Sequence, residues 1–462
     1  MAKFNKKKTQ TQEGIIAGLK TAAAGKYSNY ELLRRVTLSN LLFESNYYQS
    51  ADTIMQQIEY LVKEVAPEKV VELALECRFE QKLRHTPLWL LILVNEYHKG
   101  YSVKEALAKI ANRPDMLMDI LGMLEARNGK IKPLSQALKK GMALAFNNYG
   151  EYQIAKYKKS NLEHSLIDVV NLVHPKPIEK NAEALKKLVE DRLEAPNTWE
   201  VALSKGDDKK ATFERMIEEN SLGALAILRN IRNMKEAGIS RAIIQKAISQ
   251  VNSQWLTPLN FLAAQRIAPE FSEDINEAMK RCFANYSIKG TTILAIDVSG
   301  SMGGLTSGFS KFSRMDLAFA MAALGTYVFE DLILVFTAGS DAALKGAHCV
   351  WPNSKGLGIF NDFKDIYAKL GGGGIFTHQL CEWLKKEGYA KDAQRLVIIS
   401  DSQDIDVSRG KNVQPDTKPY EHAYIIDIST HTHGIKTGVW TAEINGWSDK
   451  LFHYILALEK GQ

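Results

Sequence analysis

The stretch TTILAIDVSGSMGG, residues 291–304, joins an apolar run rich in β-branched residues to a turn of aspartate, serine and glycine. Three similar apolar runs follow it, LILVFTA at 332–338, RLVIISD at 395–401 and AYIIDIS at 423–429. Stretches with the apolar spacing of helices lie at 314–329, 360–370, 377–388 and 447–460. Alternating strands and helices predict a Rossmann-like α/β domain with a mostly parallel, doubly wound sheet. Ligands of such sheets bind at the carboxyl ends of the strands.

The residues before this stretch have a different pattern, with apolar residues three and four apart. The clearest segments are 68–79, 87–98, 114–127 and 222–238. Such a series of amphipathic helices predicts stacked helix pairs, an α-solenoid of the HEAT type. The expected fold class is therefore α plus α/β.

Composition changes where the helical pattern ends. Residues 1–289 hold 43 basic and 34 acidic residues, whereas residues 290–462 hold 16 and 19. Eleven glycines lie in residues 1–289, and 20 lie in residues 290–462. We therefore expect a helical domain at 1–289 and an α/β domain at 290–462.

The overall composition excludes several classes of protein. With 462 residues, 45% hydrophobic and 24% charged, the chain can bury a large core and is not a disordered tail. Its four cysteines, Cys77, Cys282, Cys349 and Cys381, show neither zinc-ribbon nor disulfide-framework spacing. The basic start has no apolar leader segment, and no long apolar stretch could span a membrane. We expect a soluble, cytoplasmic protein.

The turn after the first apolar run carries Asp297, Ser299 and Ser301 at alternate positions. A carboxylate and two hydroxyls in one turn are hard oxygen ligands, suited to Mg²⁺, Mn²⁺ or Ca²⁺. The alternative is a serine-rich turn that only caps a helix. No phosphate-binding G-K-[ST] sequence and no G-x-S-x-G sequence accompanies the turn, so we do not expect an enzyme.

The D-x-S-x-S pattern at a strand end resembles the metal-ion-dependent adhesion site (MIDAS) of von Willebrand factor A (vWA) domains. In that family a threonine from a second loop and an aspartate from a third complete the site. The matching positions are Thr377, after the glycine run GGGGIF, and Asp401, at the end of RLVIIS. The resemblance implies a Mg²⁺ site, with one coordination position open to a carboxylate of a partner protein.

Basic residues gather in the helical part. Residues 127–159 contain eight basic residues and one acidic residue, with Phe146, Tyr149, Tyr152 and Tyr157 among them. Lysine and arginine contact phosphates and aromatic rings stack on unpaired bases, so this composition suits RNA. The alternative is a set of solvated helix faces. The candidate residues from charge and helix spacing are Arg127, Lys132, Lys139, Lys140, Arg229 and Arg232.

Three segments, 142–177, 222–234 and 256–265, resemble the TROVE domain of the Ro autoantigen family. Family members join a ring of HEAT-like helix pairs to a vWA domain. The resemblance implies that single-stranded RNA ends enter a basic ring and that small Y RNAs bind its outer surface. The matching residues are Lys156, Lys158 and His174, with Lys159 beside a loop that departs in length from the family pattern. His174 could also simply cap a helix.

The charge pattern and the motifs predict a non-catalytic RNA-binding scaffold, and the resemblance to the Ro family implies a role in RNA quality control, decay or maturation. The resemblance also implies its partners, which would be Y-like small RNA, single-stranded RNA ends and an exoribonuclease or another protein at the metal site, and not DNA or membranes. The alternative is a metal-dependent protein–protein adhesion or chaperone adaptor that binds no RNA. The uneven charge of the two parts favours the RNA-binding scaffold.

Overall fold

A computed structural model gives the fold of the chain. It describes residues 28–39, 51–305 except 132, 159–162, 197 and 285, 312–445 except 352–353, 390, 402, 409–410, 413–414, 416 and 429–438, and 451–460. The chain divides into two compact units, Met1–Asn197 with His453–Gln462, and Thr198–Phe452. We describe each unit by itself.

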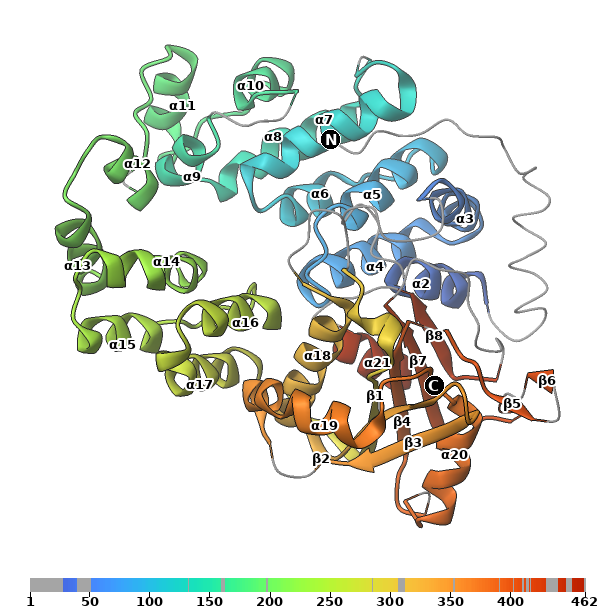
Figure 1. Cartoon of the computed structure of the whole chain (residues 1–462). Helices are drawn as coiled ribbons and strands as arrows, with labels where there is room; N and C mark the ends of the chain where they lie inside the picture. Colours follow the sequence, from blue (N-terminus) through green and yellow to red (C-terminus); the bar gives the residue numbers. More distant parts are fainter. Residues whose placement is uncertain are drawn as a thin grey trace. The chain divides into compact units, whose positions relative to one another are not determined.

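The first unit consists of helices that stack in a regular order. From α2 to α8, each helix packs against the second helix after it, so that α2, α4, α6 and α8 form one layer and α3, α5 and α7 form another (Figure 1). This is the pattern of a HEAT-like solenoid, as predicted. The helices are α2 (Asn29–Ser39), α3 (Ala51–Glu64), α4 (Pro67–Phe79), α5 (Thr86–Tyr97), α6 (Lys104–Ile110), α7 (Pro114–Asn128), α8 (Gln136–Ala145), η1 (Phe146–Asn148), α9 (Glu151–Lys156), α10 (Leu166–Val173) and α11 (Ala182–Val189).

The second unit begins with helices in the same arrangement. Here α13 packs on α15 and α15 on α17, while α14 packs on α16 and α16 on α18. The helical pattern therefore continues up to the sheet. These helices are α12 (Trp199–Ser204), α13 (Lys209–Glu218), α14 (Ala224–Glu236), α15 (Arg241–Ser249), α16 (Pro258–Ile267), η2 (Pro269–Phe271) and α17 (Ser272–Phe283).

Local sequence explains where many of these helices begin. Pro67, Pro87, Pro114 and Pro258 lie in the first turn of their helices, where a missing N–H leaves no hydrogen bond unmade. Side chains of serine, threonine or aspartate accept a backbone N–H before α8, α10, α12, α13, α15 and α18. Helix α5 is apolar along most of its length, and its residues from Thr86 to Val94 are all buried. It therefore forms the centre of the first unit's core.

The sheet has six strands in the order β3-β2-β1-β4-β7-β8. All neighbours are parallel except β2 and β3, so the sheet is mixed but mostly parallel, as predicted. The chain leaves β1 on one side to form β2 and returns on the other side to form β4. The strands are β1 (Ile288–Asp297), β2 (Phe329–Ser340), β3 (Lys345–Val350), β4 (Arg395–Ser400), β7 (His422–Asp427) and β8 (Ala442–Asn445), and a separate hairpin joins β5 (Val407–Ser408) and β6 (Lys411–Asn412).

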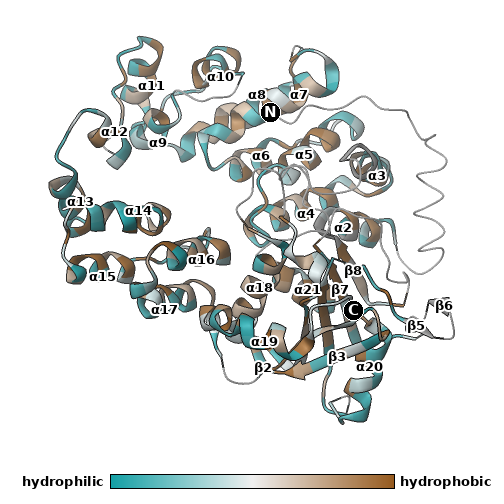
Figure 2. Cartoon of the chain, in the orientation of Figure 1, coloured by the Kyte–Doolittle hydropathy of each residue, from teal (hydrophilic) through white to brown (hydrophobic). Residues whose placement is uncertain are grey.

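Helices cover both faces of this sheet. Ile293 and Ala295 of β1 belong to one apolar cluster with Leu380 and Leu384 of α20. On the opposite face, the rings of Phe319 on α18 and Phe336 on β2 are 5.2 Å apart. Figure 2 shows the central strands as mainly hydrophobic, as expected for a sheet covered on both sides. The elements after β1 include η3 (Gly300–Gly303), α18 (Arg314–Val328), η4 (Gly356–Asp362), α19 (Phe363–Leu370), α20 (Thr377–Lys386) and α21 (Leu451–Lys460).

The four predicted strands and four predicted helices of the α/β part are confirmed, although residues 447–450 of the last predicted helix lie outside the described residues. The sequence patterns did not indicate β3, β8 or the β5–β6 hairpin. Helices end at Phe283 and strands begin at Ile288, while the compact units divide before Thr198. The predicted domain boundary at 289 therefore remains a prediction. Among the described residues, no helix is both long and apolar enough to cross a membrane.

Candidate functional site

The turn after β1 forms a compact, hydrogen-bonded loop. Asp297, fully buried, ends β1, and its Oδ1 accepts the backbone N–H of Ser299 at 2.8 Å. The hydroxyls of Ser299 and Ser301 are 3.1 Å apart. Ser400, the last residue of β4, donates its hydroxyl to Oδ2 of Asp297 at 2.6 Å. The D-x-S-x-S turn is therefore joined to the neighbouring strand.

Topology explains why these residues meet. The strand order reverses between β1 and β4, so the carboxyl ends of these two strands form the switch point of the sheet. Asp401 follows β4 directly and is fully buried. Thr377, also fully buried, is the first residue of α20. The turn before it, residues 371–376, contacts the first loop, because the Gly372 carbonyl lies 3.1 Å from where a Cβ of Gly300 would be.

The glycine run at 371–374 is required by close packing. A Cβ on Gly373 would lie 2.4 Å from the carbonyl oxygen of Gly339, and the Gly373 N–H donates to that same oxygen at 2.9 Å. A Cβ on Gly372, whose φ is +69°, would come within 2.3 Å of the Tyr367 ring. The loop can therefore approach β2 and α19 only without side chains.

Burial changes the acidity of the first carboxylate. Burial, together with the nearby charge of Asp401, raises the pKa of Asp297 to about 7, although hydrogen bonds from Ser400 and Ser299 act in the opposite direction. A carboxyl group that is costly to ionise alone is stabilised in its charged form by a bound cation. This electrostatic environment is consistent with a metal site.

The donor set fits a hard divalent cation. Asp297, Ser299, Ser301, Thr377 and Asp401 offer only oxygen, the ligand type that Mg²⁺ prefers. The hydroxyl oxygen of Thr377 is buried and has no hydrogen-bond partner within the described part of the chain. A buried hydroxyl of this kind is normally satisfied, and a cation in the loop would satisfy it. These five side chains could hold Mg²⁺, and their role as its ligands remains a prediction.

A cation from the chain itself also reaches this site, and the sequence patterns did not indicate it. Arg314 is the first residue of α18, and its Nη1 lies 3.2 Å from Asp401 Oδ2 and 3.1 Å from the Ser301 carbonyl oxygen. Its side chain is 12% exposed. A positive residue at a helix N-terminus opposes the helix dipole. The position of Arg314 directly after the capping Ser313 was therefore a signal that its side chain has another role.

Two of the predicted RNA-binding cations are neutralised by carboxylates. Arg127 forms ion pairs with Glu59 at 2.9 Å and Glu96 at 2.7 Å, and its side chain is only 16% exposed. Lys158 pairs with Asp191 at 2.7 Å and donates to the Leu193 carbonyl at 3.1 Å. Both side chains therefore have structural partners that sequence spacing could not show.

Other predicted cations remain accessible. Lys156 is exposed on α9, with its Nζ 5.7 Å from the centre of the half-exposed Tyr152 ring. Lys140 is exposed on α8, and the neighbouring Lys139 is half-buried. Lys132 and Lys159 lie outside the described residues.

The remaining candidates lie on exposed positions of their own elements. His174 follows α10 in a left-handed conformation, φ 50°, and its N–H donates to the Val170 carbonyl, so it does cap that helix. Its side chain is nonetheless exposed. In the second unit, Arg229 and Arg232 are exposed on α14, and Arg232 lies 3.6 Å from Glu236. The structure therefore leaves Lys140, Lys156, His174, Arg229 and Arg232 open to a ligand.

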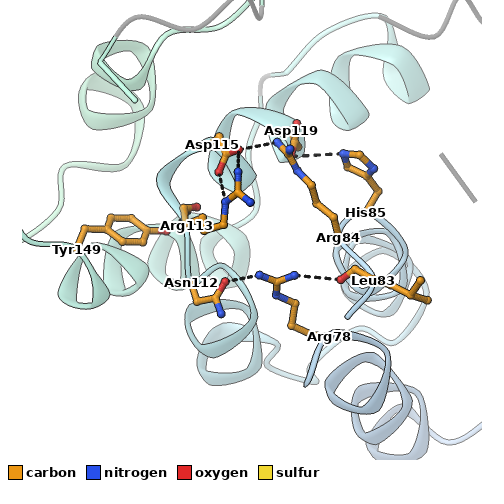
Figure 3. A network of polar contacts seen from close by, with 9 residues as sticks. All are labelled: Arg78, Leu83, Arg84, His85, Asn112, Arg113, Asp115, Asp119 and Tyr149. Carbon is orange, nitrogen blue, oxygen red and sulfur yellow. Dashed lines mark hydrogen bonds and ion pairs between the residues drawn. The ribbon is translucent and has the colours of Figure 1, made fainter. Parts of the chain in front are cut away.

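Three arginines that the sequence analysis did not single out, Arg78, Arg84 and Arg113, have structural roles (Figure 3). Arg84 and Arg113 both pair with Asp115, and Arg84 also pairs with Asp119. The buried Arg78 donates to the Leu83 carbonyl at 3.3 Å and to Asn112 Oδ1 at 2.5 Å. Burial, with the charges of the neighbouring arginines, lowers the pKa of Arg78 to about 10. These contacts hold the loops that follow α4 and α6. The three arginines therefore have partners within the protein, and no ligand is needed to explain their positions.

Comparison with known proteins supports this reading of the fold. A TROVE domain matches residues 190–327, a range that includes two of the three segments that carry the sequence resemblance. The crystal structure of the Deinococcus radiodurans Ro (RSR) protein is similar at a TM-score of 0.60 and 16% identity, over 94% of this chain and 100% of that chain. No curated protein matches the chain. The chain therefore carries a TROVE match and shares the fold of a bacterial Ro protein, which confirms its resemblance to the Ro autoantigen family.

Proposed function

We propose that this protein is a non-catalytic RNA-binding scaffold of the Ro type. The observation that carries the proposal is the TROVE match inside a chain with the Ro fold. The helical part would close into a basic ring that holds single-stranded ends of misfolded or non-coding RNA, and a Y-like small RNA would bind its outer surface. The process served would be RNA quality control, decay or maturation, in the cytoplasm.

The exposed pair of Tyr152 and Lys156 would contact RNA directly. The two residues lie one helical turn apart on α9, so a base that stacks on the Tyr152 ring would place its phosphate near the Lys156 ammonium group. His174 could contact RNA from the end of α10. Arg229 and Arg232 would contribute phosphate contacts from α14.

The metal site would serve adhesion. With Mg²⁺ bound, the charges of Asp297, Asp401, Arg314 and the ion sum to +1, so a carboxylate from another protein would be attracted to the open coordination position. The partner would be an exoribonuclease or another protein of RNA metabolism, which would then supply the chemistry. The metal itself would supply a coordination bond to that carboxylate.

The test of RNA binding is fluorescence anisotropy with a labelled single-stranded RNA and the same strand annealed into a duplex. Tyr152→Ala combined with Lys156→Ala should weaken single-strand binding by at least about tenfold, because stacking contributes about 1–3 kcal/mol per base. Arg232→Ala should lower the salt dependence. Arg215→Ala is its matched control, because Arg215 forms the same i,i+4 ion pair with Glu219 on α13. Unchanged affinity in every variant would reject this surface.

A protein-only adaptor is the second candidate, and one observation favours it. The ion pairs of Arg127 and Lys158 reduce the positive charge of the surface predicted to bind RNA. Purified protein that binds Mn²⁺ in calorimetry but neither single-stranded nor duplex RNA would establish this candidate in place of the first. Binding of RNA with a steep salt dependence would exclude it.

A further inference from the structure

An aromatic hollow opens beside the candidate metal site. Its cavity of about 400 Å³ shares Ser299 and Gly300 with the D-x-S-x-S turn, a size within the usual range of ligand pockets. Its lining also includes four aromatic side chains, Phe319 of α18, Phe360 of η4 and, from α19, Phe363 with Tyr367. The hollow thus brings residues of the D-x-S-x-S turn and four aromatic rings to one cavity.

The aromatic wall is a fixed structure. The rings of Phe360 and Phe363 each lie 5.6 Å from the ring of Phe319, and Phe363 lies 5.7 Å from Tyr367. Tyr367 packs on Gly372, where a side chain would clash with its ring. Phe319 is buried, while Tyr367 remains 41% exposed. The base of the wall is therefore closely packed, and Tyr367 is accessible to a ligand.

The charge of the candidate metal site beside the hollow favours a ligand with one negatively charged group. Two carboxylates, Arg314 and a bound Mg²⁺ would give the neighbouring metal site a formal charge of +1, which favours one negatively charged group. Arg266 and Asp316 on the rim pair with each other and add no net charge. Residues 290–462 together carry three more acidic than basic residues, so a polyanion is not attracted to this part of the chain.

We propose that the hollow is a second subsite of the metal site and binds an aromatic side chain adjacent to the metal-binding aspartate or glutamate of a partner protein. This inference rests on the proposed metal function of the D-x-S-x-S turn. Consecutive Cα atoms of a peptide lie about 3.8 Å apart, so two neighbouring side chains of a bent peptide would be close enough for one to bind the metal and the other to enter the hollow. Specificity for the partner would then come from the aromatic subsite, since the metal alone accepts any carboxylate.

The test uses the full-length protein and the peptide acetyl-Gly-Asp-Phe-Gly-amide, with binding followed by saturation-transfer NMR. Binding should require Mg²⁺ and should fall at least about tenfold when the peptide's aspartate becomes asparagine or its phenylalanine becomes alanine. EDTA should abolish it. Equal binding of the alanine peptide would overturn the proposal.

Variants of the chain separate the hollow from the metal. Gly303 lines the hollow, and a Cβ there would meet no atom within 4 Å, so Gly303→Leu should fill the cavity without a backbone clash. It should abolish peptide binding while Mn²⁺ affinity in calorimetry stays unchanged. Gly358→Leu, which also meets open space in η4, is the matched control and should keep both.

The remaining outcomes are equally decisive. Peptide binding that survives Gly303→Leu would overturn the aromatic subsite and leave the metal site intact. Failure of the wild-type protein to bind Mn²⁺ would reject the proposed metal function instead. Binding of adenosine monophosphate, but not of the peptide, at a site lost in Gly303→Leu would replace the protein partner by a nucleotide.

Discussion

Arg314 Nη1 lies 3.2 Å from Asp401 Oδ2, and Asp401 is fully buried. The guanidinium group therefore gives this carboxylate a positive partner in the absence of metal. Gly304 makes room for it, because a Cβ there would lie 3.3 Å from Arg314 Nη1. A divalent ion that enters the site must share Asp401 with this cation.

Replacement of Arg314 should therefore strengthen metal binding. Arg314→Met should raise Mn²⁺ affinity about tenfold, equivalent to about 1.4 kcal/mol, because a repelling charge is removed. The metal-free variant should melt at a lower temperature, because Asp401 loses its partner. Titration calorimetry and thermal melting with and without EDTA measure both effects. Weaker Mn²⁺ binding would instead assign Arg314 to positioning Asp401 for the metal.

Thr377→Val should separate metal binding from stability. Valine has nearly the shape of threonine, and the Thr377 hydroxyl has no hydrogen-bond partner among the described residues, so the metal-free protein should be no less stable. Mn²⁺ affinity should fall at least about tenfold, because an oxygen ligand is lost. A variant that unfolds more easily in EDTA, with unchanged Mn²⁺ affinity, would show that the hydroxyl has a structural partner and no metal role.

Acid should weaken the arginine network of the first unit. Burial acts to raise the pKa of Asp119, but its contacts with His85 and Arg84 outweigh this and leave the pKa below its ordinary value. The Asp119 carboxylate therefore binds a proton less readily in the folded protein than in the unfolded chain. Its contribution to the free energy of unfolding is complete above about pH 4 and is lost as the pH falls through the pKa of the folded form. Asp119→Asn should cost about 1–2 kcal/mol at pH 7.

Urea unfolding of the wild type and Asp119→Asn across this pH range measures the effect. The difference in free energy of unfolding between them should shrink as the pH falls below 4. A constant difference would show that the carboxylate charge contributes nothing to stability.

The glycine run should tolerate no side chain at Gly373. Gly373→Ala should lower the free energy of unfolding by about 1–3 kcal/mol, because the new methyl group would meet a backbone oxygen that cannot rotate away. Mn²⁺ affinity should fall with it, since the loop leads into Thr377. Gly358→Ala serves as the control, because its Cβ would meet no atom within 4 Å. Equal stability of the two variants in urea would contradict this packing argument.

The sequence predicted the strands whose residues are buried on both faces, because β1, β2, β4 and β7 are continuous apolar runs. Strand β3, KGAHCV, was missed because it lies at the edge of the sheet and contains lysine, glycine and histidine instead of a continuous apolar run. The five candidate metal ligands could be proposed from the D-x-S-x-S motif and from the resemblance to vWA domains. The contact between Arg314 and Asp401 could not be predicted, because the two residues are 87 positions apart in the sequence.

The basic surface shows the same limit. Lys158 meets Asp191, 33 residues later, and Arg127 meets Glu59, 68 residues earlier. A count of charges within 127–159 includes neither Asp191 nor Glu59, so it could not indicate these ion pairs. The aromatic wall is likewise assembled from three separate elements, α18, η4 and α19, whose individual sequences only suggest ordinary core residues. Pattern analysis therefore identified residues at the strand ends whose metal binding remains a prediction, and it overestimated the number of cations without a carboxylate partner.

The position of β1 between β2 and β4 also has a consequence for synthesis on the ribosome. Thr292 and its partner Arg395 are 103 residues apart in the chain. At about 5–20 residues per second, one edge of β1 stays unpaired for roughly 5–20 s after the strand has been made. An apolar strand with an open edge is prone to join another chain. The nascent protein should therefore depend on a chaperone until β4 emerges.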